Sequence, residues 1–337
     1  MRVQLKNIGD QVIVITGASS GIGLATAKMA AEKGAKLVLA ARSEEALKQV
    51  TKDISANGGE AIYVVADVGD EAEVRRIADE ANARFGGFDT WVNNAGVSIY
   101  GRLVDIPLDE QKRMFDTNYW GLVVGSTVAA QHLRQRGGAI INVGSTLSDR
   151  AIPLQGSYSA SKHAVKGFTD AFRMELGHDG APISVTLIKP GAIDTPYNEH
   201  AKSYLGFEPK HTPPVYPAES VAEAILYAAE NPVRDLFVGG AAKILALAEK
   251  YSPRLADKLM EAFTFETQKS DTPKSSNEES GLDTPSREAR VNGNYDGHVA
   301  QHSLYTKASI HPFVTGGLLL AGVGLAYAVA KARTQTR

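Results

Sequence analysis

Tyr158 and Lys162 stand four positions apart in the segment Gly156-Ser-Tyr-Ser-Ala-Ser-Lys, downstream of Ser145. Residues at this spacing share one helix face, so the phenol and the ammonium would project side by side. A free tyrosine, with a pKa of about 10, is a poor acid or base near neutral pH. A neighbouring cation favours the phenolate and should lower that pKa. The pair therefore predicts proton exchange with an alcohol or a carbonyl.

A second motif, Thr16-Gly-Ala-Ser-Ser-Gly-Ile-Gly, follows an apolar run and precedes a helical pattern. Its glycines, Gly17, Gly21 and Gly23, allow a tight turn whose backbone N–H groups point at an anion. The dipole of the following helix adds to that attraction. This turn predicts a binding site for a ligand that carries phosphate.

Short β-branched runs alternate with helical stretches as far as residue 239, which is typical of a parallel sheet with helices on both faces. We predict an α/β, doubly wound, parallel seven-stranded sheet of the Rossmann type in one domain, residues 1–240. The predicted strands are 12–16, 36–40, 61–66, 90–93, 139–143, 183–188 and 236–238. The predicted helices include 21–33, 44–56, 70–85, 109–136 and 157–176.

With these elements, residues 8 to 240 resemble the short-chain dehydrogenase/reductase family, in its single-domain branch with Tyr-x-x-x-Lys. The resemblance also involves the glycine spacing, Asn93-Asn-Ala-Gly and Pro190-Gly-Ala-Ile-Asp-Thr. It implies that Ser145 polarises the substrate carbonyl and that Tyr158 is the acid/base. Lys162 would lower the Tyr158 pKa and hold the cofactor ribose, and Asn118 would hold a water that connects Lys162 to solvent.

The resemblance further implies a nicotinamide dinucleotide site built from the glycine turn, the ends of the strands and the catalytic helix. Its predicted residues are Gly17, Ser19, Ser20, Gly21, Ile22, Gly23, Arg42, Ser43, Asp67, Val68, Asn94, Ala95, Gly96, Tyr158, Lys162, Pro190, Gly191, Ile193 and Thr195.

The end of the second predicted strand bears on the choice of cofactor. An acid there would bond the ribose 2′-hydroxyl of NAD(H), whereas an arginine accommodates the 2′-phosphate of NADP(H). Positions 40 and 41 are alanines and Arg42 follows, so we expect NADP(H). Alternatively, Arg42 only begins a solvated helix face. Asp67 resembles a carboxylate that contacts adenine, but it could instead cap the next helix.

The composition excludes several other classes. With 36 basic and 38 acidic side chains, the chain has no global field of the kind that attracts nucleic acid. The absence of cysteine excludes disulfides and thiolate metal sites. His298 and His302 have the spacing of a helical ligand pair, but no carboxylate motif accompanies them, so no metal is expected. No secretory signal precedes the first strand.

The C-terminal third changes in character. We expect a pair of helices over 241–264, with Pro253 at the start of the second helix. Residues 265–308 are rich in Ser, Thr, Asp, Glu, Asn, Gly and Pro and predict a disordered linker. Residues 312–330 are uncharged and mostly apolar, which predicts a transmembrane helix. Packing of this stretch on the catalytic domain or its dimer mate is the alternative.

Basic residues after this stretch favour a cytoplasmic tail. That conflicts with cofactor supply and the missing signal, which favour a membrane-associated enzyme whose catalytic domain is cytoplasmic.

These features together predict an NADP(H)-dependent oxidoreductase that interconverts a carbonyl and a secondary alcohol. A lid over 196–217 would cover a small-molecule alcohol or ketone, and its side chains suit a lipophilic substrate: Tyr197, Tyr204, Leu205, Phe207 and Tyr216. The alternatives are the same chemistry on a polar metabolite or an acyl-linked ketone, and a non-catalytic redox sensor that binds a dinucleotide. The resemblance also implies a homodimer or homotetramer formed through helices 109–136 and 157–176.

Overall fold

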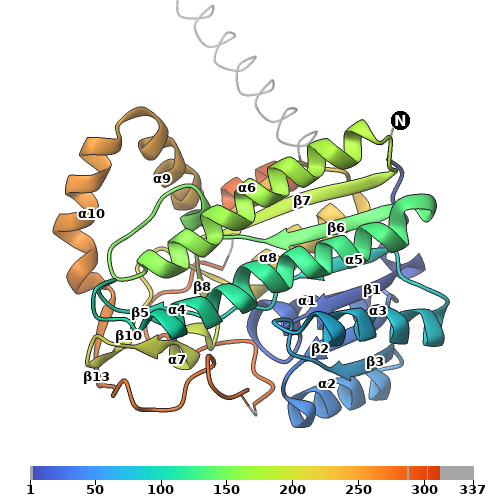
Figure 1. Ribbon diagram of the computed structural model, residues 1–337, viewed down its shortest axis with the longest axis horizontal. Coiled ribbons are helices and arrows are strands. Elements are labelled where there is room, and N and C mark those ends of the chain that lie inside the picture. Colours follow the sequence, from blue (N-terminus) through green and yellow to red (C-terminus); the bar gives the residue numbers. More distant parts are fainter. Residues whose placement is uncertain (1–2, 287, 302, 312–337) are drawn as a thin grey trace, which may run out of the picture.

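The central sheet has seven parallel strands in the order β12-β7-β6-β4-β1-β2-β3 (Figure 1). The computed structural model describes residues 3–286, 288–301 and 303–311. The strands are β1 (Val12–Thr16), β2 (Lys36–Ala41), β3 (Glu60–Val65), β4 (Thr90–Asn93), β6 (Gly138–Val143), β7 (Ile183–Pro190) and β12 (Asp235–Val238). The predicted fold class and all seven predicted strands are confirmed, with shifts of one or two residues at several ends.

Alternating side chains of β1 divide the core into two layers. Ile13 and Ile15 belong to an apolar cluster on one face of the sheet, and Val14 belongs to a second cluster on the other. Successive side chains of a strand point to opposite faces, so an unbroken apolar run is buried on both. This is why the strands of this chain read as continuous Val, Ile and Leu runs.

Two helical layers cover these faces. The helices α1 (Gly21–Glu32), α2 (Glu44–Ala56) and α8 (Ala218–Glu230) contribute to the first cluster. The helices α3 (Glu71–Phe85), α5 (Gly121–Arg136) and α6 (Gly156–His178) contribute to the second, on the side that faces the viewer in Figure 1. The two layers leave the carboxyl ends of the strands open, and this edge positions the site.

The predicted single helix over 109–136 is divided in the structure. α4 (Leu108–Phe115) is followed by η2 (Asp116–Trp120), a turn of π-helix, and then by α5. A π turn often marks a functional position because it redirects a side chain out of the regular helical ladder. Here the redirected turn contains Asn118, which is 1% exposed.

Short elements connect the layers near the open edge of the sheet. They are η3 (Thr146–Ser148), α7 (Tyr197–His200), β5 (Ile99–Tyr100), β8 (Ala192–Asp194), β9 (Lys202–Ser203), β10 (Phe207–Pro209) and β11 (Val215–Pro217). A further short helix, η1 (Ile8–Asp10), precedes β1 at the opposite edge. β5 pairs with β9, and β8 pairs with β11. These small sheets fold the segment after β7 back over the carboxyl ends of the main strands.

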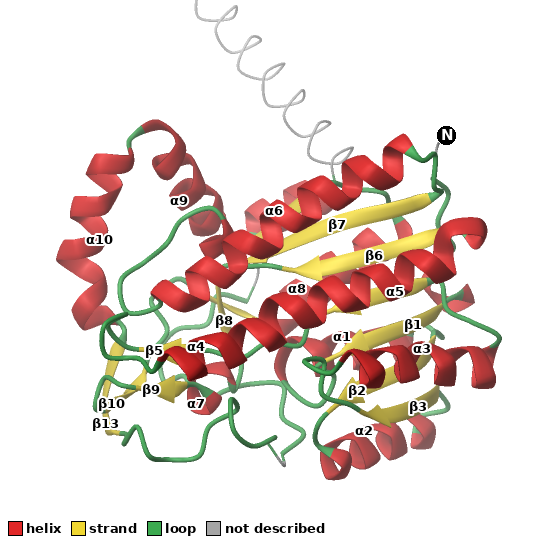
Figure 2. Cartoon of the chain, in the orientation of Figure 1, coloured by secondary structure: helices red, strands yellow, loops and turns green. Residues whose placement is uncertain are grey.

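The predicted helix pair is present as α9 (Gly240–Tyr251) and α10 (Pro253–Thr267). Pro253 occupies the first turn of α10, as predicted. In Figure 2 the pair extends beyond the sheet, above the small strands that cover its edge.

The prediction of a disordered linker over 265–308 is not confirmed and needs correction. β13 (Lys269–Pro273) pairs antiparallel with β10, and Leu282 is 4% exposed. A further helix, α11 (Leu304–Ile310), buries Ile310 against the main apolar cluster. The polar composition of this segment does not prevent it from folding, because hydrogen bonds and ion pairs hold it to the folded domain. It therefore needs few apolar side chains of its own.

The predicted transmembrane helix over 312–330 lies outside the residues that the structure describes. Within the described part of the chain, no helix combines the length and the apolar character needed to cross a bilayer.

Candidate active site

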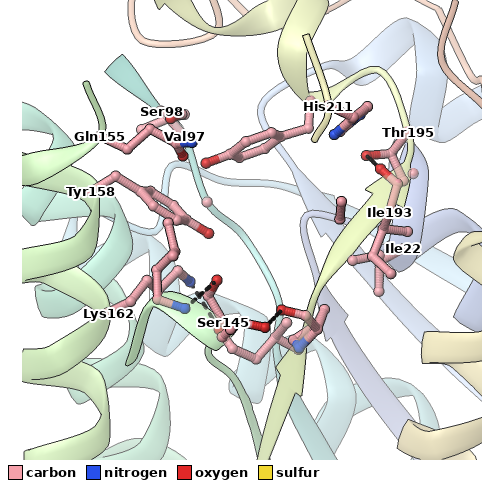
Figure 3. Close-up of a pocket in the computed structure, with 18 of the residues that line it drawn as sticks. Ile22, Val97, Ser98, Ser145, Gln155, Tyr158, Lys162, Ile193, Thr195 and His211 are labelled. Carbon is pink, nitrogen blue, oxygen red and sulfur yellow. Dashed lines mark hydrogen bonds between the residues drawn. The ribbon is translucent and has the colours of Figure 1, made fainter. Parts of the chain in front are cut away.

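A cavity of about 720 Å³ opens at the carboxyl ends of the parallel strands. Open α/β sheets bind ligands at this edge, where the strand order reverses. All the predicted cofactor residues except Gly23 line the cavity, as do Ser145, Tyr158 and Lys162. In Figure 3, Tyr158 and Lys162 lie on one side of it, across from Ile193 and Thr195. Residues far apart in the sequence are therefore brought to one space.

The glycine turn forms a cradle that admits no side chain. A Cβ atom added at Gly17 would lie 2.8 Å from the Ala95 Cα, and one at Gly23 would lie 2.1 Å from the Gly17 carbonyl oxygen. Gly17 and Gly21 also have φ angles of +66° and +52°, which favour glycine. A bare backbone at a helix N-terminus beside a cavity of this size fits a dinucleotide diphosphate. Gly23 thus shapes the turn without lining the cavity.

Asn94 clamps this cradle to the next strand. Its side-chain amide donates hydrogen bonds to the carbonyls of Thr16, at 3.0 Å, and of Gly17, at 3.2 Å. Its backbone N–H donates to the Thr16 hydroxyl at 3.0 Å. The segment Asn94 to Gly96 is therefore held along one wall of the cavity.

Ser145 is positioned by the short helix that follows it. Its Oγ accepts a hydrogen bond from the Leu147 N–H at 3.0 Å, and its own N–H donates to Ser148 Oγ at 3.1 Å. This reciprocal capping box fixes the serine at the end of β6. A hydroxyl has one proton and two acceptor lone pairs, so Ser145 can accept this bond and still donate to a ligand oxygen.

Tyr158 and Lys162 lie in the first turns of α6, as the spacing predicted. Lys162 Nζ donates to the Val143 carbonyl at 2.9 Å and lies 5.7 Å from the centre of the Tyr158 ring. Lys162 is 4% exposed, and this burial lowers its pKa to about 8. The two side chains share one face of the helix and one wall of the cavity.

The expectation that Lys162 lowers the Tyr158 pKa needs correction. Burial raises the pKa of Tyr158, and the neighbouring Tyr197 and Ser145 hydroxyls act in the opposite direction. The Lys162 ammonium donates its hydrogen bond to the Val143 carbonyl. The neighbouring groups that oppose the effect of burial on the Tyr158 pKa are thus hydroxyls.

Asn118 does not line the cavity. Its side chain forms a pair of hydrogen bonds with the backbone of Val97, at 2.8 Å and 2.9 Å. It also donates to Ser161 Oγ at 3.3 Å, and Ser161 in turn donates to the Tyr158 carbonyl at 2.7 Å. In this structure Asn118 thus ties η2 to α6 and to the cavity wall, and its predicted role in holding a water stays a prediction.

The alternatives at Arg42 and Asp67 are partly decided. Both side chains line the cavity, so Arg42 is not simply part of a solvated helix face. Its guanidinium donates to the Gly281 carbonyl. The acid that caps α3 is Asp70, which accepts from the Ala72 N–H at 2.8 Å, so the alternative of Asp67 as the cap is wrong.

The predicted lid is partly confirmed. Tyr197 and Tyr216 line the cavity, and the Tyr197 ring packs edge-on against Tyr158 with ring centres 5.7 Å apart. Tyr204 instead hydrogen-bonds Glu110 at 2.9 Å, and Phe207 belongs to β10 and is 40% exposed. Tyr204, Leu205 and Phe207 do not line the cavity.

Sequence reasoning missed several lining residues. They come from the loop after β4, the residue before α6, the loop after β10, the helices α9 and α10, and the segment predicted to be a linker: Val97, Ser98, Gln155, His211, Leu245, Met260, Gly281, Pro285 and Ser286. The Ser98 and Tyr197 hydroxyls are buried and form no hydrogen bond with the described residues. Burial raises the pKa of Tyr197. Burial also lowers the His211 pKa to about 4. No local motif marks these positions.

Comparison with known proteins agrees with this geometry. The family described as short chain dehydrogenase matches residues 11–205. An uncharacterized oxidoreductase, YxnA, of Bacillus subtilis (strain 168) is 51% identical over 333 residues, covering 98% of this chain and 93% of the relative.

Two solved structures share the fold. A short chain dehydrogenase/reductase from Burkholderia phymatum in complex with NAD has a TM-score of 0.67 and 28% identity, covering 76% of this chain and 96% of that one. An alcohol dehydrogenase from the archaeon Thermococcus sibiricus, complexed with 5-hydroxy-NADP, has a TM-score of 0.60 and 27% identity, covering 68% and 95%. With its sheet, its glycine cradle and its Ser145–Tyr158–Lys162 wall, the chain belongs to the short chain dehydrogenase family and is an oxidoreductase.

Proposed function

We propose that this protein uses NADP(H) to interconvert a carbonyl and a secondary alcohol, with Tyr158 as the acid/base. The observation that carries the proposal is that Ser145, Tyr158 and Lys162 line the same cavity as the glycine cradle and Arg42. A reduced nicotinamide dinucleotide, when bound, supplies the hydride that reaches the carbonyl carbon. Negative charge then develops on the carbonyl oxygen, and the protein must meet it.

Two hydroxyls are available for that oxygen. Ser145 donates a hydrogen bond, and Tyr158 supplies the proton in reduction or removes it in oxidation. The raised pKa of Tyr158 suits proton donation, while the neighbouring hydroxyls of Tyr197 and Ser145 favour the phenolate for the reverse step. Lys162, held by the Val143 carbonyl, would orient the cofactor ribose.

Arg42 supports NADP(H) as the cofactor. It stands at the end of β2 and lines the cavity, where a 2′-phosphate would lie, and the guanidinium recognises phosphate through charge-assisted hydrogen bonds. NAD(H) would make no comparable contact with this side chain.

The cavity wall supports a lipophilic substrate. Apolar side chains reach it from the loop after β4, from η3 and the loop that follows it, and from α9 and α10: Val97, Leu147, Ile152, Leu245, Leu259 and Met260. Such a wall binds an apolar alcohol or ketone by excluding water. Attachment to a membrane through residues 312–330, with the catalytic domain in the cytoplasm, would bring the enzyme to such substrates and is part of this proposal.

A panel of ketones and alcohols, assayed with NADPH and with NADH, tests the proposal. We expect turnover of apolar carbonyls with NADPH, and loss of turnover in Tyr158→Phe by at least about a hundredfold, as for removal of an acid/base group. Binding of NADPH by Tyr158→Phe should remain. Arg42→Ala should lower the preference for NADPH over NADH by about tenfold or more.

Several results would count against it. Turnover in Tyr158→Phe close to wild type would remove Tyr158 from its role. Activity confined to small hydrophilic carbonyls would favour a polar metabolite or an acyl-linked ketone. Dinucleotide binding without turnover of any carbonyl or alcohol would favour a redox sensor.

A further inference from the structure

The C-terminal segment crosses the cofactor end of the cavity. Residues 280–286 and 288–293, which we call the strap, run beneath α7 in the orange part of Figure 1. Gly281, Pro285 and Ser286 line the same cavity as the glycine cradle and Arg42. The strap lies beyond the matched family region, which ends at residue 205. It also follows β12, the last strand of the central sheet along the chain.

The strap is bonded to two of the groups assigned to the cofactor phosphates. The Gly21 N–H, in the first turn of α1, donates to the Arg290 carbonyl at 2.9 Å. The Arg42 guanidinium donates to the Gly281 carbonyl. Each strap carbonyl thus presents its partial negative charge where a phosphate oxygen would be attracted.

Specific contacts fasten the strap on both sides of these carbonyls. Leu282 packs in the apolar cluster that contains Tyr158, and the Gly281 N–H donates to the His200 carbonyl at 2.7 Å. Asp283 pairs with Arg113 at 2.6 Å and with Lys202 at 3.3 Å.

The second half of the strap has its own fastenings. Arg290 pairs with Glu199 at 2.7 Å, and the Gly293 N–H donates to Asp194 Oδ1 at 3.1 Å. The hydrogen-bond and ion-pair partners lie on α4, α7, β8 and β9. The strap thus has anchors besides its bonds to Gly21 and Arg42.

A backbone N–H has one hydrogen and can serve one of these acceptors at a time. Hydrogen bonds to a charged phosphate are roughly twice as strong as bonds to a neutral carbonyl. We propose that the strap and the dinucleotide compete for Gly21 and Arg42, so that the C-terminal segment gates the cofactor site. This inference rests on the proposed function, because it requires that the cradle bind a dinucleotide.

Gating predicts that weaker anchors give tighter cofactor binding. Asp283→Asn combined with Arg290→Ala removes ion pairs of the strap and leaves Gly21 and Arg42 intact. Asp179→Asn is the matched control, because Asp179 pairs with Arg134 away from the cavity. In the full chain, titration of NADPH fluorescence should show a Kd about three- to tenfold lower for the double variant, as expected for loss of a few partly exposed ion pairs. The control should bind like wild type.

Hydrogen exchange gives a second measurement that does not depend on the variants. Addition of NADP⁺ to the wild-type chain should slow exchange in residues 16–24 and speed it in the strap, whose Gly281 and Gly293 amides lose their acceptors.

The outcomes separate this inference from the function on which it rests. Slower exchange in both segments would mean that the strap closes over the bound cofactor, and it would overturn the proposed competition between strap and dinucleotide. An unchanged or higher Kd in the double variant would also overturn it. Absence of any effect of NADP⁺ or NAD⁺ on residues 16–24 would overturn the dinucleotide site itself and the gate with it.

Discussion

Burial, more than any single charge, determines the acid-base behaviour of Tyr158 and Lys162. The Tyr158 phenol is 8% exposed and has a raised pKa, and Lys162 is 4% exposed with a pKa lowered to about 8. Both shifts have the same cause, since a low-dielectric surrounding disfavours the charged form of either group. The site thus holds both side chains closer to neutrality than their sequence spacing suggested.

The Lys162 shift predicts that stability rises with pH in the alkaline range. Between about pH 8 and the unfolded value of about 10.5, the unfolded chain binds the proton while the folded chain has released it, so the free energy of unfolding increases with pH. We expect a gain on the order of 1 to 2 kcal/mol from about pH 8 to about pH 9.5, which Lys162→Met should lack. Urea denaturation at stepped pH, without dinucleotide, measures this.

The pH range in which stability increases must end near pH 10. The raised Tyr158 pKa acts with the opposite sign, because above about pH 10 the unfolded tyrosine loses its proton first. Equal pH slopes for wild type and Lys162→Met would show that the buried ammonium is not the cause.

At the scale of elements, two local irregularities build the site. The left-handed residues of the glycine turn bring the N-terminus of α1 to the cavity, and the π turn η2 places Asn118 against Val97. Neither turn is part of a regular α-helix or β-strand, and the contacts of each turn determine its conformation. Regular elements position the site, and these irregular turns give it its shape.

Gly23→Ala should disrupt the cradle. Its new Cβ would lie 2.1 Å from the Gly17 carbonyl oxygen and 2.6 Å from the Asn94 side chain, closer than real Cβ atoms approach. We expect a loss of stability of about 1–3 kcal/mol, typical of overpacking, and loss of dinucleotide binding. Thermal unfolding and NADPH titration measure the two effects.

Gly167→Ala is the control, because an added Cβ there meets no atom within 4 Å and the residue lies within α6. Dinucleotide binding by Gly23→Ala equal to that of Gly167→Ala would contradict the assigned role of the cradle.

At the scale of the whole molecule, aromatic side chains form a surface that spans η2 and α6. Trp120 is 53% exposed, and Tyr119 packs edge-on against both Trp120 and Phe168. Exposed apolar groups that lie together are typical of association sites. These helices are the ones through which a homodimer or homotetramer was predicted, and we propose this surface as its interface.

Trp120→Glu should therefore weaken the oligomer. A buried carboxylate without a partner costs several kcal/mol at an interface, so we expect a smaller species by light scattering after size exclusion. Leu247→Glu, on α9 and 41% exposed, is the control for a charge placed on another apolar surface. A Trp120→Glu protein of unchanged mass would place the interface elsewhere.

Much of the fold and the candidate site was predictable. The strands form continuous apolar runs because both faces of each are buried, and the residues of the glycine turn, Ser145 and Thr195 follow strands whose ends must meet at one edge. The strap was not predictable from composition, because Leu282 and Asp283 find their partners on α4 and near α7 only after the chain folds. The membrane segment over 312–330 stays a prediction from apolar length.

The sequence by itself determined which groups could do chemistry and on which elements they stand, since periodicity and strand ends are local properties of the chain. Only the tertiary structure decided the electrostatic state of those groups and what covers them. Burial depends on neighbours from distant segments. The Val143 carbonyl that holds Lys162 and the Arg290 carbonyl that holds Gly21 also come from distant segments. Such contacts have no signature in the spacing of residues, because each joins parts of the chain that meet only when the sheet and its coverings are complete.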